Sequence, residues 1–94
     1  MTDDAARRDA ETMMAEIEAE FRRACEATHK FMAYYTAKNN HPPIAEYLRR
    51  YGEWLTESQP FAASYRRISS EFPELMDRLH KLLLPIQREF DEPP

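Results

Sequence analysis

Hydrophobic and small residues recur in a strict four-then-three spacing through the first third of the chain. Residues 3–38 contain no proline and no glycine. The recurring positions, here called the N-terminal seam, are Ala10, Met14, Ile17, Phe21, Ala24, Thr28, Phe31 and Tyr35. This spacing places every one of them along a single face of a helix. The pattern therefore predicts one long helix over residues 3–38.

Prolines divide the remainder of the chain into three shorter predicted helices. The segment Asn-Asn-His-Pro-Pro at 39–43 should end the long helix, because proline disfavours helical geometry in the residue before it. Apolar stripes then predict helices at residues 43–55, 59–71 and 71–88, with Pro60 and Pro73 in first turns. Residues 91–94 are expected to form a disordered acidic tail.

Composition points to an all-α fold. The 94 residues include one glycine and no valine, whereas Ala, Glu, Arg and Leu, which favour helices, are abundant. Sheet proteins need glycine at their hairpin turns, and this chain has almost none. We therefore expect a single domain over residues 1–90, built as a small bundle of about four helices around the long N-terminal one.

Charge and cysteine content bear on location. The net charge of −4 is uneven: residues 28–88 carry nine Lys or Arg against six acids, between two acidic ends. The single cysteine, Cys25, excludes an internal disulfide framework and fits a reducing compartment. The longest apolar run, residues 82–84, is far shorter than the ~20 residues of a membrane span, and no signal peptide is evident. A cytoplasmic protein without membrane contact is expected.

Catalytic and metal-binding motifs are nearly absent. A Gly-rich phosphate loop is excluded by the single glycine, so we expect neither enzymatic activity nor a cofactor. Glu26-x-x-His29 and Asp77-x-x-His80 match part of the pattern of ferritin-like di-iron bundles, although one motif carries Asp in place of Glu. A carboxylate/His metal-binding bundle is therefore a remote alternative, and no metal ligand is assigned.

Residues 31–46 suggest DNA binding as another alternative. The residues concerned are Phe31, Tyr34, Tyr35, Asn39, Asn40, Pro42, Pro43 and Glu46. They resemble the opening of LexA-type winged helix-turn-helix domains, in which an apolar helix, an Asn-containing turn and Pro-Pro lead into the motif. The resemblance implies a transcriptional regulator with Arg66 and Arg67 on a recognition helix. It covers 16 residues, and the acidic net charge argues against it, so nucleic acid ranks behind protein as a partner.

A protein partner is favoured first by the N-terminal seam. Three short helices can scarcely cover the part of the seam from Ala10 to Phe21. Met14, Ile17 and Phe21 are therefore expected to pair with a second chain, either a copy in a homodimer or a target protein.

Aromatic residues favour the same interpretation. Tyr47, Tyr51 and Trp54 share one face of the second predicted helix, and Tyr and Trp are enriched at binding hot spots. The function expected from the sequence is that of a small non-enzymatic regulatory protein. Such an antiactivator, inhibitor or adaptor would block or bridge its partner through helix surfaces.

Overall fold

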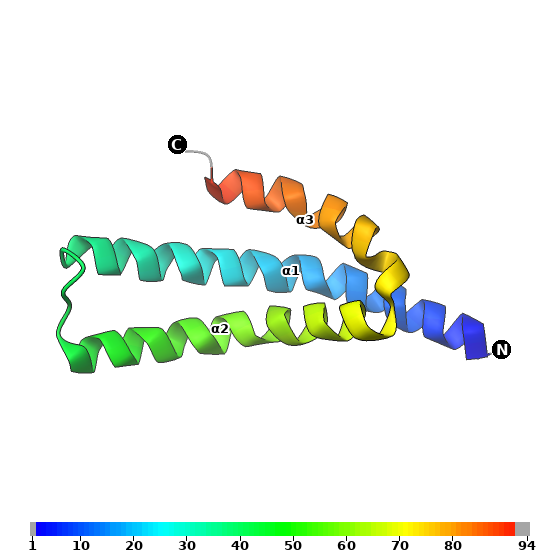
Figure 1. The fold of residues 1–94 in the computed structure, drawn as a ribbon, viewed down its shortest axis with the longest axis horizontal. Helices are drawn as coiled ribbons and strands as arrows, with labels where there is room; N and C mark the ends of the chain where they lie inside the picture. The colour runs from blue at the N-terminus through cyan, green and yellow to red at the C-terminus, as the bar shows by residue number, and fades with distance from the viewer. Residues whose placement is uncertain (1, 92–94) are drawn as a thin grey trace.

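A computed structural model describes residues 2–91 and contains three α-helices (Figure 1). They are α1 (Thr2–Ala37), α2 (Ile44–Glu71) and α3 (Met76–Asp91), with a short 3-10 helix, η1 (Pro73–Leu75), before α3. Over these residues there is no strand, so the all-α class is confirmed. The expectation of about four helices is wrong. Asp91 belongs to α3, and the rest of the expected tail, residues 92–94, lies outside the described part.

The predicted helices at 43–55 and 59–71 are one helix, α2, which runs through Pro60. Proline inside a helix costs about 3 kcal/mol, because it lacks the N–H that would bond to the preceding turn. A second four-then-three seam continues across Pro60 and offsets this cost by burying apolar surface against α1. Its members are Tyr47, Tyr51, Trp54, Ser58, Phe61, Tyr65, Ile68 and Phe72.

The turn between α1 and α2 forms at the predicted place. Asn39 and Asn40 adopt positive φ angles of 54° and 61°, a left-handed conformation that asparagine tolerates better than most residues. Pro43 directly precedes α2, and its carbonyl accepts the first helical hydrogen bond, from Tyr47, at 2.9 Å. The chain is thereby turned back on itself into a helical hairpin.

The third helix covers only part of this hairpin. In Figure 1, α2 runs antiparallel to α1, and α3 returns along the other side of α1 in the same direction as α1. The 16 residues of α3 span about 24 Å at ~1.5 Å per residue, whereas the molecule is 55 Å long. The core therefore lies where all three helices meet. Its buried members are Met13, Met14, Ile17, Ile68, Leu79, Leu83 and Ile86.

Two ion pairs fix the register of α3 on α1. Arg78 donates to Glu11 at 3.1 Å, and Arg22 donates to Glu89 at 2.7 Å. The hydrogen bonds and charges of the arginines lower the pKa of both carboxyl groups from the ordinary value of 4.5. A lowered pKa means that each pair stabilises the fold above that value and that this contribution is lost as the pH falls below it. The pairs are exposed, so they contribute more to register than to stability.

Two leucines of α3 test this core. Leu79 is 0% exposed and Leu84 is 45% exposed. We expect Leu79→Ala to lower the free energy of unfolding by about 2–5 kcal/mol, because it leaves a cavity among three helices. Leu84→Ala is the matched control and should cost less than about 1 kcal/mol. Urea unfolding followed by circular dichroism measures both values, and equal losses would contradict the assigned core.

Candidate functional site

The part of the hairpin around the α1–α2 turn, residues 28–55, extends beyond the end of α3. We refer to it as the hairpin end. Helix α3 stops beside its beginning, where the rings of Phe90 and His29 lie 5.4 Å apart. Ile44 is 78% exposed and Leu48 is 59% exposed, and Met32 and Tyr51 are exposed as well. Four of the five exposed large hydrophobic side chains among the described residues thus lie at this end.

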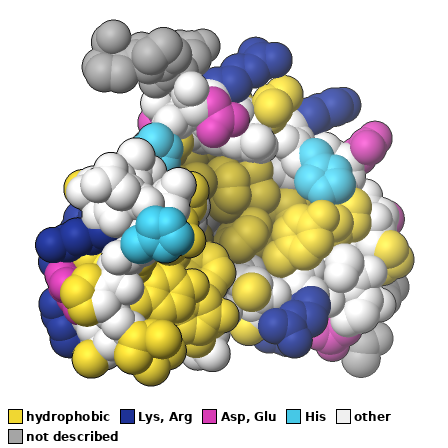
Figure 2. Space-filling model, turned by 60° about the vertical axis from the view of Figure 1, so that its left-hand side comes forward, with side chains coloured by type: hydrophobic (Ala, Val, Ile, Leu, Met, Phe, Trp, Pro, Cys, Tyr) yellow, Lys and Arg dark blue, Asp and Glu magenta, His cyan; other side chains and the backbone are white. Residues whose placement is uncertain are grey.

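The two sides of the hairpin differ in chemistry. One side, the apolar face, carries Phe21, Cys25 and Met32 on one stripe of α1 and Leu48, Leu55 and Ala62 on the neighbouring stripe of α2. Figure 2 shows hydrophobic side chains gathered at the hairpin end and lining a hollow beside it. The opposite side, the charged face, carries Arg23, Glu26 and Lys30 of α1 and Arg50, Glu53 and Glu57 of α2.

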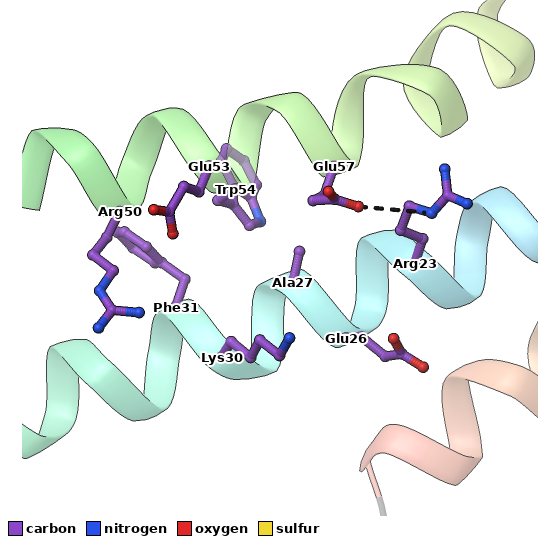
Figure 3. A pocket seen from close by; sticks show the side chains of 9 residues that line it. All are labelled: Arg23, Glu26, Ala27, Lys30, Phe31, Arg50, Glu53, Trp54 and Glu57. Atoms are coloured by element: carbon purple, nitrogen blue, oxygen red, sulfur yellow. Dashed lines mark ion pairs between the residues drawn. The ribbon is translucent and has the colours of Figure 1, made fainter.

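On the charged face, acids and bases are balanced. These side chains line a shallow pocket of about 370 Å³ whose floor is formed by Phe31 and Trp54 (Figure 3). Arg23 pairs with Glu57 across the two helices at 3.6 Å. Arg49 and Glu53 pair along α2 at 2.9 Å. With three acids and three bases, the lining of this pocket has no net charge, and it offers less apolar surface to a partner than the apolar face does.

Aromatic rings form a layer between the two faces. Phe31 is at its centre, with ring centroids 5.6 Å from Tyr47, 6.3 Å from Tyr51 and 6.3 Å from Trp54. Trp54 Nε1 donates a hydrogen bond to Thr28 Oγ1 at 2.9 Å, which ties α2 to α1. The layer holds the two helices together in the absence of α3 and gives the hairpin end a defined shape.

A groove between α2 and α3 opens onto the hairpin end. Helix α3 packs mainly on α1, and near its start the Tyr65 hydroxyl is hydrogen-bonded to His80 Nε2 at 2.9 Å. The groove comprises two adjoining hollows of about 430 and 410 Å³ that share Phe21, Phe61 and Gln87. Trp54, Phe90 and Cys25 line the hollow nearer the hairpin end. Burial raises the pKa of the Cys25 thiol, with a smaller contribution from Asp91, so the thiol stays protonated and acts as apolar lining.

The structure separates the six predicted binding residues into two groups. Tyr47, Tyr51 and Trp54 come together in the aromatic layer, with stacked Tyr47 and Tyr51 rings 6.1 Å apart. The expectation that the seam from Ala10 to Phe21 is uncovered is wrong, since Ile17 is 0% exposed and Met14 is also buried. Phe21 is partly buried against Phe61, at 4.8 Å, and forms part of the groove. The reason is that the unbroken α2 reaches the seam and α3 covers its other side.

Four of the exposed hydrophobic residues, three on the hairpin and one on α3, were missed in the sequence. Met32, Ile44, Leu48 and Leu84 lie on helical stripes that resemble core positions. The lengths of the helices could have revealed these exposed residues, because a third helix of about 16 residues cannot cover a hairpin whose first helix has about 36.

The two alternative interpretations gain no support from the geometry. The stretch that resembles a winged helix-turn-helix opening forms the α1–α2 turn, but α2 then continues unbroken to Glu71 and also carries Arg66 and Arg67. Among the side chains that the structure describes, residues 5 and 7–91, no three of His, Cys, Asp or Glu come close enough to hold a metal ion. The Glu26/His29 and Asp77/His80 motifs therefore do not form a joint site. Nor does any described helix combine the length and apolar character of a membrane span.

No family model, curated protein or solved structure matches this chain. Its function is therefore inferred from the described residues alone.

The bond between Trp54 and Thr28 can be tested by a matched pair of substitutions. Thr28 and Thr56 both donate their hydroxyl to the carbonyl four residues earlier, but only Thr28 accepts from Trp54. We expect Thr28→Val to cost about 0.5–1.5 kcal/mol more than Thr56→Val in urea unfolding, because it leaves the indole N–H without its partner. The fluorescence of Trp54, the only tryptophan, should change with Thr28→Val alone. A spectrum that responds equally to both substitutions would show that the bond is absent.

Proposed function

We propose that this chain is a small non-enzymatic regulatory protein that binds an α-helix of a partner protein on the apolar face of its hairpin. As an antiactivator, inhibitor or adaptor, it would block or bridge the partner by occupying that helix. The observation that carries the proposal is the continuation of the apolar face beyond α3, where Ile44 and Leu48 are exposed. Contiguous exposed apolar surface of this kind marks interaction sites in soluble proteins.

The dimensions of the apolar face suit one helix. Along α2, the open surface runs from Tyr65, at the far end of the groove, to Ile44 beside the turn. These 21 residue steps correspond to about 31 Å, so a helix of roughly 20 residues would cover it. Such binding is the helix-in-groove mode, in which an amphipathic helix places its apolar stripe in a hydrophobic groove.

Helix α3 supports this mode of binding, because it already occupies the neighbouring part of the same face. Leu79, Leu83 and Ile86 of α3 are buried against the hairpin, whereas Lys81 and Arg88 are exposed. A partner helix with the same alternation would continue the packing of α3 toward the turn. Its apolar residues would contact Tyr51 and Trp54 of the aromatic layer, which is rigid and rich in side chains typical of hot spots.

The proposal predicts that Leu48→Glu abolishes partner binding while the fold persists. The substitution places a charge on the open apolar surface, and burying that charge under a partner helix should weaken binding at least about tenfold, equivalent to about 1.4 kcal/mol. Ala19→Glu is the matched control, because it introduces the same charge at an exposed position on the side of α1 that faces away from Phe21 and Met32. Both variants should retain the circular dichroism of the unmodified chain.

Binding is measured first by quantitative mass spectrometry of proteins retained from an extract of the producing cells, and then by calorimetry with the purified protein. Only a protein that is retained by the unmodified chain and by Ala19→Glu, but lost with Leu48→Glu, supports the proposal. Equal retention by all three chains would refute it.

A further inference from the structure

The hairpin end has the opposite charge to the start of the chain. Residues 28–55 carry four basic residues and two acidic ones, a net charge of +2 without His29 and His41. The basic residues are Lys30, Lys38, Arg49 and Arg50. Residues 1–27 carry eight acids and four arginines, a net charge of −4. The exposed apolar surface at the turn therefore lies in the positively charged part of an acidic protein.

Both carboxylates of the hairpin end belong to the charged face. Glu53 lines the charged pocket and pairs with Arg49. Glu46 is seven residues earlier, on the same side of α2; burial raises the pKa of Tyr34, and the charge of Glu46 adds to that rise. Neither carboxylate of residues 28–55 is therefore on the side of Met32, Ile44 and Leu48, whereas Lys38 lies in the turn. Asp91, at the end of α3, lines the adjoining hollow.

A second copy of this chain is a poor occupant of this surface. Its acidic segment, residues 1–27, has its apolar side chains Ala10, Met14 and Ile17 buried in its own core. Its exposed apolar side chains lie mainly at its own hairpin end, which is also positively charged. Among the side chains that the structure describes, no exposed large hydrophobic one lies in this acidic segment, and contact between two hairpin ends would place like charges together.

We infer that the helix bound at the hairpin end is an acidic amphipathic helix of another protein, with carboxylates on both sides of its apolar stripe. This inference rests on the proposed function and specifies the chemistry of the partner. The apolar stripe would cover Met32, Ile44 and Leu48, and its carboxylates would face Lys38 and the surrounding positive potential. Complementary charge of this kind selects among helices that share the same apolar stripe.

Two synthetic helical peptides provide the test. Both have about 20 residues, the same Leu-rich stripe and no tryptophan, and they carry either Glu or Lys at the flanking positions. Each is titrated into the full chain, with Trp54 fluorescence and calorimetry as readouts, because Trp54 is the only tryptophan and lines the groove. We expect the Glu-flanked peptide to bind at least about tenfold tighter at low salt. This preference should fall below about threefold at 0.5 M salt, where charges are screened.

Substitutions separate the two contributions to binding. Leu48→Glu should abolish binding of the Glu-flanked peptide, because it disrupts the apolar contact. Lys38→Glu should lower the affinity for that peptide by about three- to tenfold and raise the affinity for the Lys-flanked peptide. Arg8→Glu makes the same charge change far from the hairpin end and should leave the ratio of the two affinities unchanged.

The outcomes distinguish failure of the inference from failure of the proposed function. If both peptides bind equally and Leu48→Glu abolishes both, the helix site stands and the acidic partner is refuted. If neither peptide binds at millimolar concentration, the proposed function fails and the inference fails with it. A dimer in sedimentation equilibrium that Leu48→Glu dissociates would identify a second copy as the occupant and would also overturn the inference.

Discussion

The pairing of α1 with α2 along two four-then-three seams is the interaction on which the rest of the structure depends. The seams meet antiparallel, with Phe21 against Phe61 near the middle and Phe31 against Tyr51 closer to the turn. Because the pairing runs the whole length of α2, it is maintained through Pro60 in spite of the lost hydrogen bond. It also turns one apolar stripe of each helix to the same side, and so produces a continuous apolar face opposite the charged one.

The apolar face is longer than the helix that the chain provides to cover it. Helix α3 reaches about 24 Å along a hairpin of about 54 Å, and Glu11 and Glu89 fix where it lies. The part beneath α3 becomes the core. The part beyond α3 is also apolar, but no helix packs on it. There the aromatic layer stabilises the pairing of α1 with α2 in place of a third helix. The proposed binding surface is therefore the uncovered part of the surface that holds the core together.

The sequence predicted the helical class, the length of α1, the turn at 39–43 and the shared face of Tyr47 and Trp54 with little ambiguity. Each depends on local spacing, on composition or on the restricted geometry beside proline. The predicted division of α2 at Pro60 was wrong. It rested on the local cost of proline in a helix and neglected the apolar seam, which continues on both sides of Pro60. The placement of the binding surface at Ile17 was wrong for a non-local reason, since coverage depends on how far α2 and α3 reach along α1.

Native-state amide hydrogen exchange tests most directly the central claim, that α3 covers one part of the hairpin and leaves the other open. Local opening is easier where fewer apolar contacts must be broken, so exchange distinguishes the two parts within one molecule. The amides of residues 13–24, beneath α3, should be protected at least about tenfold more than those of residues 48–55, which are also hydrogen-bonded inside a helix, a difference of about 1.4 kcal/mol. Equal protection along both segments, or stronger protection at 48–55, would show that the hairpin end is covered and would contradict the claim.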